Sequence, residues 1–270
     1  EEGFVFTTVK ELPITSIKNQ NRAGTCWSYS AIAFLEAELL RMGKGEYDFS
    51  EMFIVHNTYL DRADKAVRTH GDVSFSQGGS FYDVLYGMKN FGLVPEAEMR
   101  PGVMYGDTLS THNELSAVSD AVVAAIAKGR SSKLQSDVNG NMLWKKAIEA
   151  IHDIYLGKRP EKFTYNGKEY TPKSFYESTG LNADDYVSLT SYTHHPFYSQ
   201  FVLEIQDNWR WAQSYNWPID EFMEVFDNAI MNGYTIAWGS DVSETGFTRN
   251  GIAVMPDVDK VQELSGSDMA

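Results

Sequence analysis

The commonest pattern along the chain is apolar residues three or four positions apart, which is typical of amphipathic helices. This spacing predicts a helix from about Cys26 to Met42, which Gly43 would end. Ser50 can cap a second helix that runs to about Val67. Further helices are predicted over residues 80–92, 114–129, 141–157, 171–180 and 218–233. We therefore expect the first hundred residues to be mainly helical, with more helices beyond them.

Strand patterns are fewer and shorter. Residues 1–22 predict extended chain, because apolar and polar positions alternate there before a proline interrupts them. Asn166 and Gly167 lie between two short aromatic runs, which is a strong signal for a two-residue hairpin turn. A clear strand pattern comes only near the end, in "YTIAWGSD" at residues 234–241. The pattern as a whole favours an α+β fold.

Composition excludes several classes of protein. The chain has 270 residues, of which 43% are hydrophobic, and this is enough for one large domain or two smaller ones. No apolar run approaches the ~18 residues that a membrane-spanning helix needs, so we expect no membrane partner. The formal net charge of −14 argues against a nucleic-acid binder, which would carry a basic patch. The acidity favours solubility; a preference for cationic substrates is the alternative.

The one cysteine, Cys26, stands at the start of the first predicted helix. Unpaired backbone N–H groups and the helix dipole favour a thiolate there, and the thiolate is the nucleophilic form. Gly24 lets the backbone approach a substrate closely. The Gln20 amide and the Cys26 N–H could donate to one oxyanion, and each such donor contributes about 3 kcal/mol. The alternative is a buried structural cysteine.

The residues around Cys26 resemble a known catalytic motif. Gln20, five further residues and then Cys26-Trp27 resemble the papain-like cysteine peptidases. Ala23 replaces a second cysteine of that motif, and this change removes half of a disulfide and no catalytic group. The resemblance implies that Cys26 is the nucleophile, that Gln20 helps to hold the oxyanion, and that Gly24, Thr25 and Trp27 lie at the substrate site.

Two later segments extend the resemblance. "FSEMF" at residues 49–53 and "SQGGSFYDVL" at residues 76–85 are similar to papain-like segments in the same order. The resemblance implies that Gly78 and Gly79 pair their backbone with the substrate peptide. By itself, the same Gly-Gly-Ser is as often the entry to a helix.

Three segments of the second half identify a branch of these peptidases. Residues 163–177, 190–197 and 216–242 resemble the bleomycin hydrolase and bacterial aminopeptidase C group. The resemblance implies a papain-like fold with a large helical insertion and an incomplete β-barrel half. We expect a papain-like helical half at 1–105, the insertion at 106–232 and the start of the barrel half at 233–270. Members of the group remove N-terminal amino acids from peptides, form hexameric rings and use no cofactor. The resemblance therefore implies a cytoplasmic, homo-oligomeric aminopeptidase acting on peptides; a periplasmic or secreted location is the alternative.

A cysteine peptidase also needs a histidine base, and the histidines present do not fit the family pattern. His56 is expected to be a satisfied helix residue, His70 and His112 to be solvated in loops, and His152 to lie beside an apolar helix face. The adjacent His194 and His195 lack the i, i+4 spacing of a helical metal site, so we expect no metal.

We therefore expect the catalytic His and Asn to lie beyond residue 270, the chain being a fragment, a truncated form or one piece of a nicked enzyme. A catalytically inactive fragment that serves as a binding or assembly piece is the main alternative. A different thiol acyl-transferase on the same fold is a third possibility.

Overall fold

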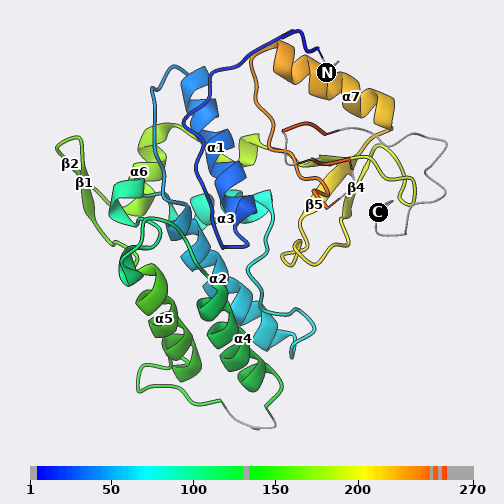
Figure 1. Ribbon diagram of the computed structural model, residues 1–270. Coiled ribbons are helices and arrows are strands. Elements are labelled where there is room, and N and C mark those ends of the chain that lie inside the picture. Colours follow the sequence, from blue (N-terminus) through cyan, green and yellow to red (C-terminus); the bar gives the residue numbers. More distant parts are fainter. Residues whose placement is uncertain (1–4, 130–133, 244–245, 249–250, 254–270) are drawn as a thin grey trace. The chain divides into compact units, whose positions relative to one another are not determined.

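The computed structural model describes residues 5–129, 134–243, 246–248 and 251–253. The chain divides into two compact units, residues 1–236 and 237–270. The first unit contains the helices α1 to α7 and five short strands, shown in Figure 1. The helices are α1 (Cys26–Arg41), α2 (Glu51–Arg68), α3 (Phe81–Phe91), α4 (Asn113–Ala127), α5 (Leu143–Leu156), α6 (Pro172–Thr179) and α7 (Ile219–Met231). Single 3-10 turns lie at Glu96–Glu98, Val103–Tyr105 and Ala183–Asp185.

The predicted helix starts are confirmed by their caps. The Ser50 hydroxyl accepts a hydrogen bond from the Phe53 N–H at 3.1 Å and begins α2. Ser80 and Asp83 form a reciprocal capping box at the start of α3. Thr171 caps α6 in the same reciprocal way. These caps are local, because each joins residues three apart, and so the sequence pattern is enough to locate them.

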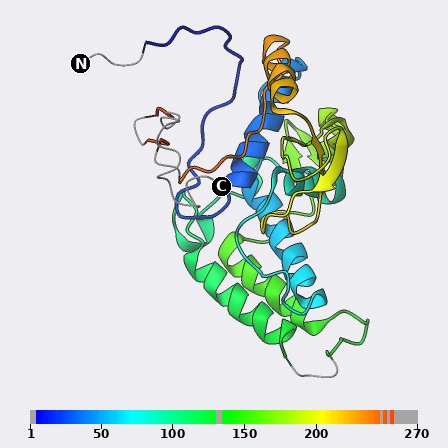
Figure 2. The same cartoon turned by 90° about the vertical axis from the view of Figure 1, so that its right-hand side faces the viewer.

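One hydrophobic core joins α1 to α6. Figure 2 shows α4 and α5 side by side, and both also pack on α2. The buried residues form one contiguous cluster that includes Ile32, Leu35, Ile54, Leu115, Ile148 and Phe175. The segment predicted as an insertion therefore shares its core with the segment before it. The division at residue 105 stays a prediction about relationship to other proteins.

The predicted hairpin is confirmed. The strands β1 (Phe163–Tyr165) and β2 (Lys168–Tyr170) pair antiparallel. Asn166 and Gly167 connect them with φ angles of 49° and 78°. Both values are positive, as a type I′ turn requires, and this explains the Asn-Gly pair.

A second, three-stranded sheet was not predicted. It consists of β3 (Leu189–Thr190), β4 (Ser199–Val202) and β5 (Gln213–Asn216), in the order β3-β5-β4. The central strand β5 is parallel to β3 and antiparallel to β4. These strands are two to four residues long, which is too short for a strand pattern to be recognised in the sequence.

The helix α7 is confirmed, but the strand expected after it is wrong. Phe222, Phe226 and Ile230, which the spacing predicts to face the core, are half-buried. Residues 234–241 have no strand conformation. A strand persists only when its backbone groups pair with a neighbour, and no described segment pairs with this one. In the second unit, the described residues hold an antiparallel bridge between Phe247 and Ala253.

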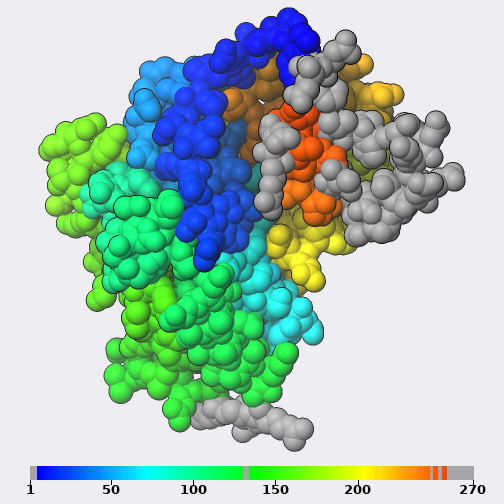
Figure 3. Space-filling view, viewed as in Figure 1, coloured from blue at the N-terminus to red at the C-terminus, as the bar shows by residue number. Residues whose placement is uncertain are grey.

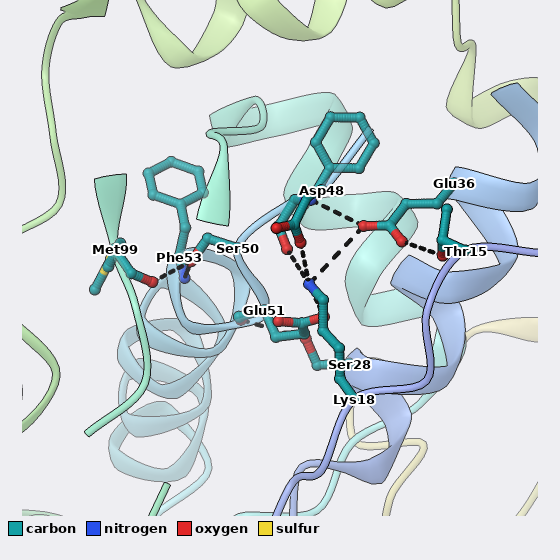
Figure 4. A network of polar contacts seen from close by, with 10 residues as sticks. Thr15, Lys18, Ser28, Glu36, Asp48, Ser50, Glu51, Phe53 and Met99 are labelled. Carbon is teal, nitrogen blue, oxygen red and sulfur yellow. Dashed lines mark hydrogen bonds and ion pairs between the residues drawn. The ribbon is translucent and has the colours of Figure 1, made fainter. Parts of the chain in front are cut away.

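A buried charge cluster fastens the N-terminal segment to α1 and α2 (Figure 4). We call Lys18, Glu36, Asp48, Glu51 and Glu96 the Lys18 cluster. The Lys18 ammonium lies 2.7 Å from Asp48, 2.9 Å from Glu51 and 3.9 Å from Glu36. It also donates to the Phe49 carbonyl at 3.0 Å. The cluster helps to position residues 5–21, which form no helix or strand, and Figure 3 shows this dark-blue segment on the surface.

Burial controls the protonation of the Lys18 cluster. Loss of solvation raises the pKa of Glu51 to about 8 and that of Glu96 to about 7, although the Lys18 charge opposes both shifts. One oxygen of each of these two carboxyls is buried without a hydrogen-bond partner. A proton held by either group supplies the missing donor.

Of the helices among the described residues, none has the length and hydropathy needed to span a bilayer.

Candidate active site

Cys26 is the first residue of α1, and its thiol is exposed. The helix ladder begins with the N–H groups of Ser28 and Tyr29, which both donate to the Thr25 carbonyl, at 2.9 and 3.2 Å. No side chain caps this end of the helix. Within the described part of the chain, neither the Cys26 thiol nor its backbone N–H has a hydrogen-bond partner. The helix start therefore offers an unused donor and a positive dipole end directly at the thiol.

Gln20 is held in the turn that precedes α1. One of its amide N–H groups donates to the Ala23 carbonyl at 2.8 Å. An amide carries two such hydrogens, so this bond fixes the side chain and leaves one N–H for another acceptor. Asn21 takes a positive φ of 50°, which turns the chain back toward the helix. The second amide N–H of Gln20 is therefore available to donate to an oxyanion.

The two predicted glycine segments lie against each other. The Gly24 N–H donates to the Gln77 side-chain oxygen at 2.8 Å, and the Trp27 indole N–H donates to the Gln77 carbonyl at 3.0 Å. A Cβ on Gly79 would lie 2.8 Å from the Trp27 ring, and one on Gly24 would lie 3.0 Å from the Gln77 Cβ. Close packing against the ring therefore favours glycine at position 79, and a Cβ at position 24 would need Gln77 to move by a few tenths of an ångström. Gln77 joins the cysteine loop to the Gly78-Gly79 segment, and sequence reasoning did not single it out.

Two residues predicted at the substrate site point inward. Thr25 is 0% exposed and Trp27 is 3% exposed. Thr25 is therefore enclosed as a whole residue, and its carbonyl accepts the first hydrogen bonds of α1. The buried Trp27 ring packs against Gly79, and its indole N–H bonds to the Gln77 carbonyl. Of the rest of the predicted set, Cys26 and Gly24 are exposed, and Gln20, Gly78 and Gly79 are half-buried.

An aspartate that the sequence analysis missed lies over Gly78. A Cβ on Gly78 would lie 2.0 Å from the Asp207 Oδ1 atom, so a larger residue there would displace this carboxylate. The Gly78 carbonyl accepts a hydrogen bond from the buried Arg62, which also donates to the Ser74 carbonyl at 2.9 Å. Asp207 itself is exposed. The peptide-binding segment predicted from the sequence thus carries a fixed negative charge on its solvent side.

Arg210 holds the segment that carries Asp207. Its guanidinium bonds to Asp83 of α3 at 2.5 Å and to Asp61 of α2 at 2.8 Å. It also stacks on Tyr86, with 3.8 Å between the guanidinium carbon and the ring centroid. Residues 207–211 therefore dock on both helices. No signal in the one-dimensional pattern connects residue 207 with residue 78.

The histidines do not supply a base to Cys26. His56 lies on α2 as expected, with its Nε2 atom 2.9 Å from Asp153, but it is not fully satisfied, because its buried Nδ1 atom has no hydrogen-bond partner among the described residues. Burial lowers the pKa of His56 to about 3. His70 is exposed, as expected. His152 is buried and bonds to Ser119 at 3.0 Å. The expectation of a solvated His112 is wrong.

His112 is 1% exposed, and its ring lies 3.2 Å from the Tyr59 hydroxyl. It immediately precedes α4, and the packing of α4 on α2 encloses the ring. Burial lowers its pKa to about 4. In the part of the chain that the structure describes, no histidine ring is hydrogen-bonded to the Cys26 thiol.

Comparison with known proteins places these residues in a family. A family model described as the Peptidase C1-like family matches residues 2–269, and the chain belongs to this family. Aminopeptidase C of Streptococcus thermophilus is 22% identical over 93% of this chain and 64% of its own length. Aminopeptidase E of Lactobacillus helveticus is 23% identical over 98% of this chain and 67% of its own length.

A solved structure shows the shared fold. The crystal structure of PepW from Lactobacillus rhamnosis HN001 has a TM-score of 0.64 at 19% identity, and the match covers 89% of this chain and 63% of that chain. The chain thus spans slightly less than two thirds of PepW and of the first relative. The predicted papain-like, aminopeptidase C resemblance is confirmed. The relatives are named aminopeptidases, and the fold of this chain is mixed α and β.

Proposed function

We propose that the protein is a cysteine-type aminopeptidase that hydrolyses peptide bonds at peptide N-termini through a thioester acyl-enzyme. The observation that carries this proposal is the exposed Cys26 thiol at the uncapped start of α1, beside the Gln77-tied Gly78-Gly79 segment. Family membership and the relatives named aminopeptidases support it. A cytoplasmic location and a homo-hexamer belong to the same proposal by resemblance.

The proposed chemistry starts with the Cys26 thiolate. It attacks the carbonyl carbon of the first peptide bond, and the carbonyl oxygen becomes an oxyanion. The Cys26 N–H and the remaining Gln20 N–H donate to that oxygen. The amine of the shortened peptide takes a proton and leaves, and water then hydrolyses the thioester. The proton transfers need a base, which we assign to a histidine outside these 270 residues.

Asp207 explains in this proposal why the substrate would need a free amino terminus. An aminopeptidase must recognise an α-ammonium group close to the reacting bond. Asp207 offers an exposed carboxylate over Gly78, and Gln77 connects that glycine to the Gly24 loop beside the nucleophile. A charged hydrogen bond from ammonium to carboxylate is among the stronger polar contacts in proteins. The Asp207 carboxylate would therefore favour unblocked peptides.

The second candidate function is an inactive binding or assembly piece. It is favoured by one observation: none of the described histidine rings is hydrogen-bonded to the Cys26 thiol. A thiol without a base would keep ordinary reactivity. The two proposals therefore differ in the rate at which Cys26 reacts.

Labelling by an epoxide thiol reagent at neutral pH, followed by intact mass, separates the two. With the histidine-bearing segment present, the aminopeptidase proposal expects Cys26 to be labelled faster than free cysteine, and Cys26→Ala, which removes the one cysteine of these 270 residues, to lose that labelling. Labelling no faster than free cysteine favours the inactive piece. Cleavage of an aminoacyl fluorogenic substrate but not of its N-blocked analogue would then identify an aminopeptidase.

Asp207→Asn tests the amino-terminal anchor in the active enzyme. It should raise KM for the free-amine substrate by about tenfold, the worth of roughly one charged hydrogen bond. Asp227→Asn, an exposed change on α7, is the matched control and should leave KM unchanged. An unaltered KM in Asp207→Asn would remove Asp207 from the proposal.

A further inference from the structure

The turn between β3 and β4 brings three potential metal ligands together. His194 and His195 lie in this turn, and Glu204 follows β4. The His194 Nε2 atom lies 3.2 Å from one Glu204 oxygen, and the His195 Nε2 atom lies 2.9 Å from the other. The three ligand atoms all lie within 4.8 Å of one another. The sequence analysis expected no metal because adjacent histidines lack helical ligand spacing.

Adjacent histidines can converge here because the turn is held from inside. Asn216, at the end of β5, is 0% exposed. Its side-chain NH2 donates to the carbonyls of Tyr192, His195 and Pro196, at 2.8, 3.0 and 3.3 Å. Its side-chain oxygen accepts from the Tyr192 N–H at 2.8 Å. A single buried amide thus fixes the backbone on both sides of the histidine pair.

The rings themselves are also positioned. The His195 ring stacks on the buried Phe201 ring, with 4.0 Å between centroids and 21° between planes. The His194 ring packs against Tyr192 at 5.4 Å. Both histidines keep the ring edge that carries Nε2 toward Glu204. Packing therefore orients the two histidine rings before any ion binds.

The donor set selects a class of ion. Two imidazole nitrogens and one carboxylate oxygen are typical ligands of zinc and neighbouring transition metals, and are a poor set for calcium or magnesium. Tetrahedral zinc at about 2.0–2.1 Å from each ligand atom needs ligands roughly 3.3 Å apart. The observed nitrogen–oxygen distances of 3.2 and 2.9 Å lie close to that spacing, although they reach different Glu204 oxygens, and one ligand atom from each residue lies within 4.8 Å of the others.

We propose that His194, His195 and Glu204 form a binding site for a divalent transition-metal ion such as zinc. The ion takes the place of the hydrogens that link the two Nε2 atoms to the carboxylate, and each ring binds it as a neutral imidazole whose hydrogen is on Nδ1. The exposed side chains leave a fourth coordination position open to water. Metal binding would join the β3–β4 turn to Glu204, two residues after β4.

Zinc titration of the full chain, prepared without a histidine tag, tests the site. The Cys26→Ser background is used because the exposed thiol is itself a zinc ligand. Calorimetry should give one bound zinc, and cobalt should show visible absorption of a tetrahedral site. Glu204→Gln and His194→Ala, both at exposed side chains, should each weaken binding by about tenfold or more.

His70→Asn is the matched control, because His70 is exposed outside the cluster and asparagine tolerates its positive φ of 54°. It should bind zinc like the parent. No zinc binding in the parent, or equal affinity in all three variants, would overturn the proposal. Circular dichroism confirms folding of each variant, and only folded variants are compared.

Discussion

Lys18→Met is expected to destabilise the fold, and to do so much more at alkaline than at acidic pH. Lys18 is the cation that faces the buried carboxylates of Glu36 and Glu51, whose side chains are each only 2% exposed. Methionine keeps the length of the side chain and removes the charge. The remaining carboxylates would then be buried without a counter-ion, which is the costly way to break a buried ion pair.

The magnitude follows from the burial of the partners. Removing one member of a buried pair costs about 3–5 kcal/mol, and we expect about 3 kcal/mol because Lys18 itself is 23% exposed. Burial already raises the pKa of Glu51 to about 8 against the opposing charge of Lys18. Without that charge, the pKa of Glu51 rises further.

The sign of the pH dependence is set by this raised pKa. A carboxyl whose folded pKa exceeds its unfolded pKa stabilises the fold below the unfolded value, 4.5 for Glu51, and that stability is lost as pH rises toward 8. In Lys18→Met the loss extends further, because the folded protein holds the proton more tightly. The free energy of unfolding of Lys18→Met should therefore lie below that of the parent by about 3 kcal/mol at about pH 8, and by only about 1 kcal/mol at about pH 5; we call this difference the deficit.

Urea unfolding followed by tryptophan fluorescence at both pH values measures the deficit. The double variant Lys18→Met/Glu51→Gln should recover most of it at the higher pH. Lys162→Met is the control, because it breaks an exposed pair with Glu169 whose side chains are 66% and 67% exposed, and it should cost less than about 1 kcal/mol at either pH. An equal deficit at both pH values, or no recovery in the double variant, would refute the reasoning.

Three further predictions concern single side chains. Gly79→Ala should lower stability by about 1–3 kcal/mol in urea, because the new methyl would meet the Trp27 ring; an unchanged midpoint would contradict this packing. Asn216→Ala should lower the free energy of unfolding by about 2–3 kcal/mol in thermal unfolding, because buried carbonyls lose their donor. If Asn232→Ala, at an exposed asparagine, cost more than Asn216→Ala, the prediction would be contradicted. Burial, aided by the Arg159 charge, lowers the pKa of His56 to about 3, so its stabilising contribution is present above 6.5 and is lost as pH falls. His56→Gln should flatten the acid limb of the stability curve, by up to about 1.4 kcal/mol per pH unit, and parallel curves would exclude that role.

Local signals predicted the helices and the hairpin well. Ser50 and Ser80 mark helix starts through bonds that span three residues, and Asn166-Gly167 defines its turn through backbone angles alone. The candidate nucleophile was also predicted from a local pattern, because Gln20 and Cys26 lie on one short loop and one helix start.

Long-range contacts decided the features that were missed. The β3-β5-β4 sheet pairs short strands whose partners lie far apart in the sequence, and residues 234–241 have strand residues but no partner. His112 looks like a loop residue until α4 packs on α2. A strand or a buried ring depends on what lies beside it, and periodicity does not report that.

The sequence by itself determined where the helices begin, which family motif surrounds Cys26, and that this thiol stands at a helix start. Only the tertiary structure decided that Asp207 lies over Gly78 and that Lys18 pairs with the buried carboxylates of Glu36 and Glu51. It alone also brings the rings of His194 and His195 to Glu204. The physical reason is range. Caps, turns and helix dipoles act within one turn of chain, whereas charge pairing and ligand convergence depend on distances between residues that only folding brings together.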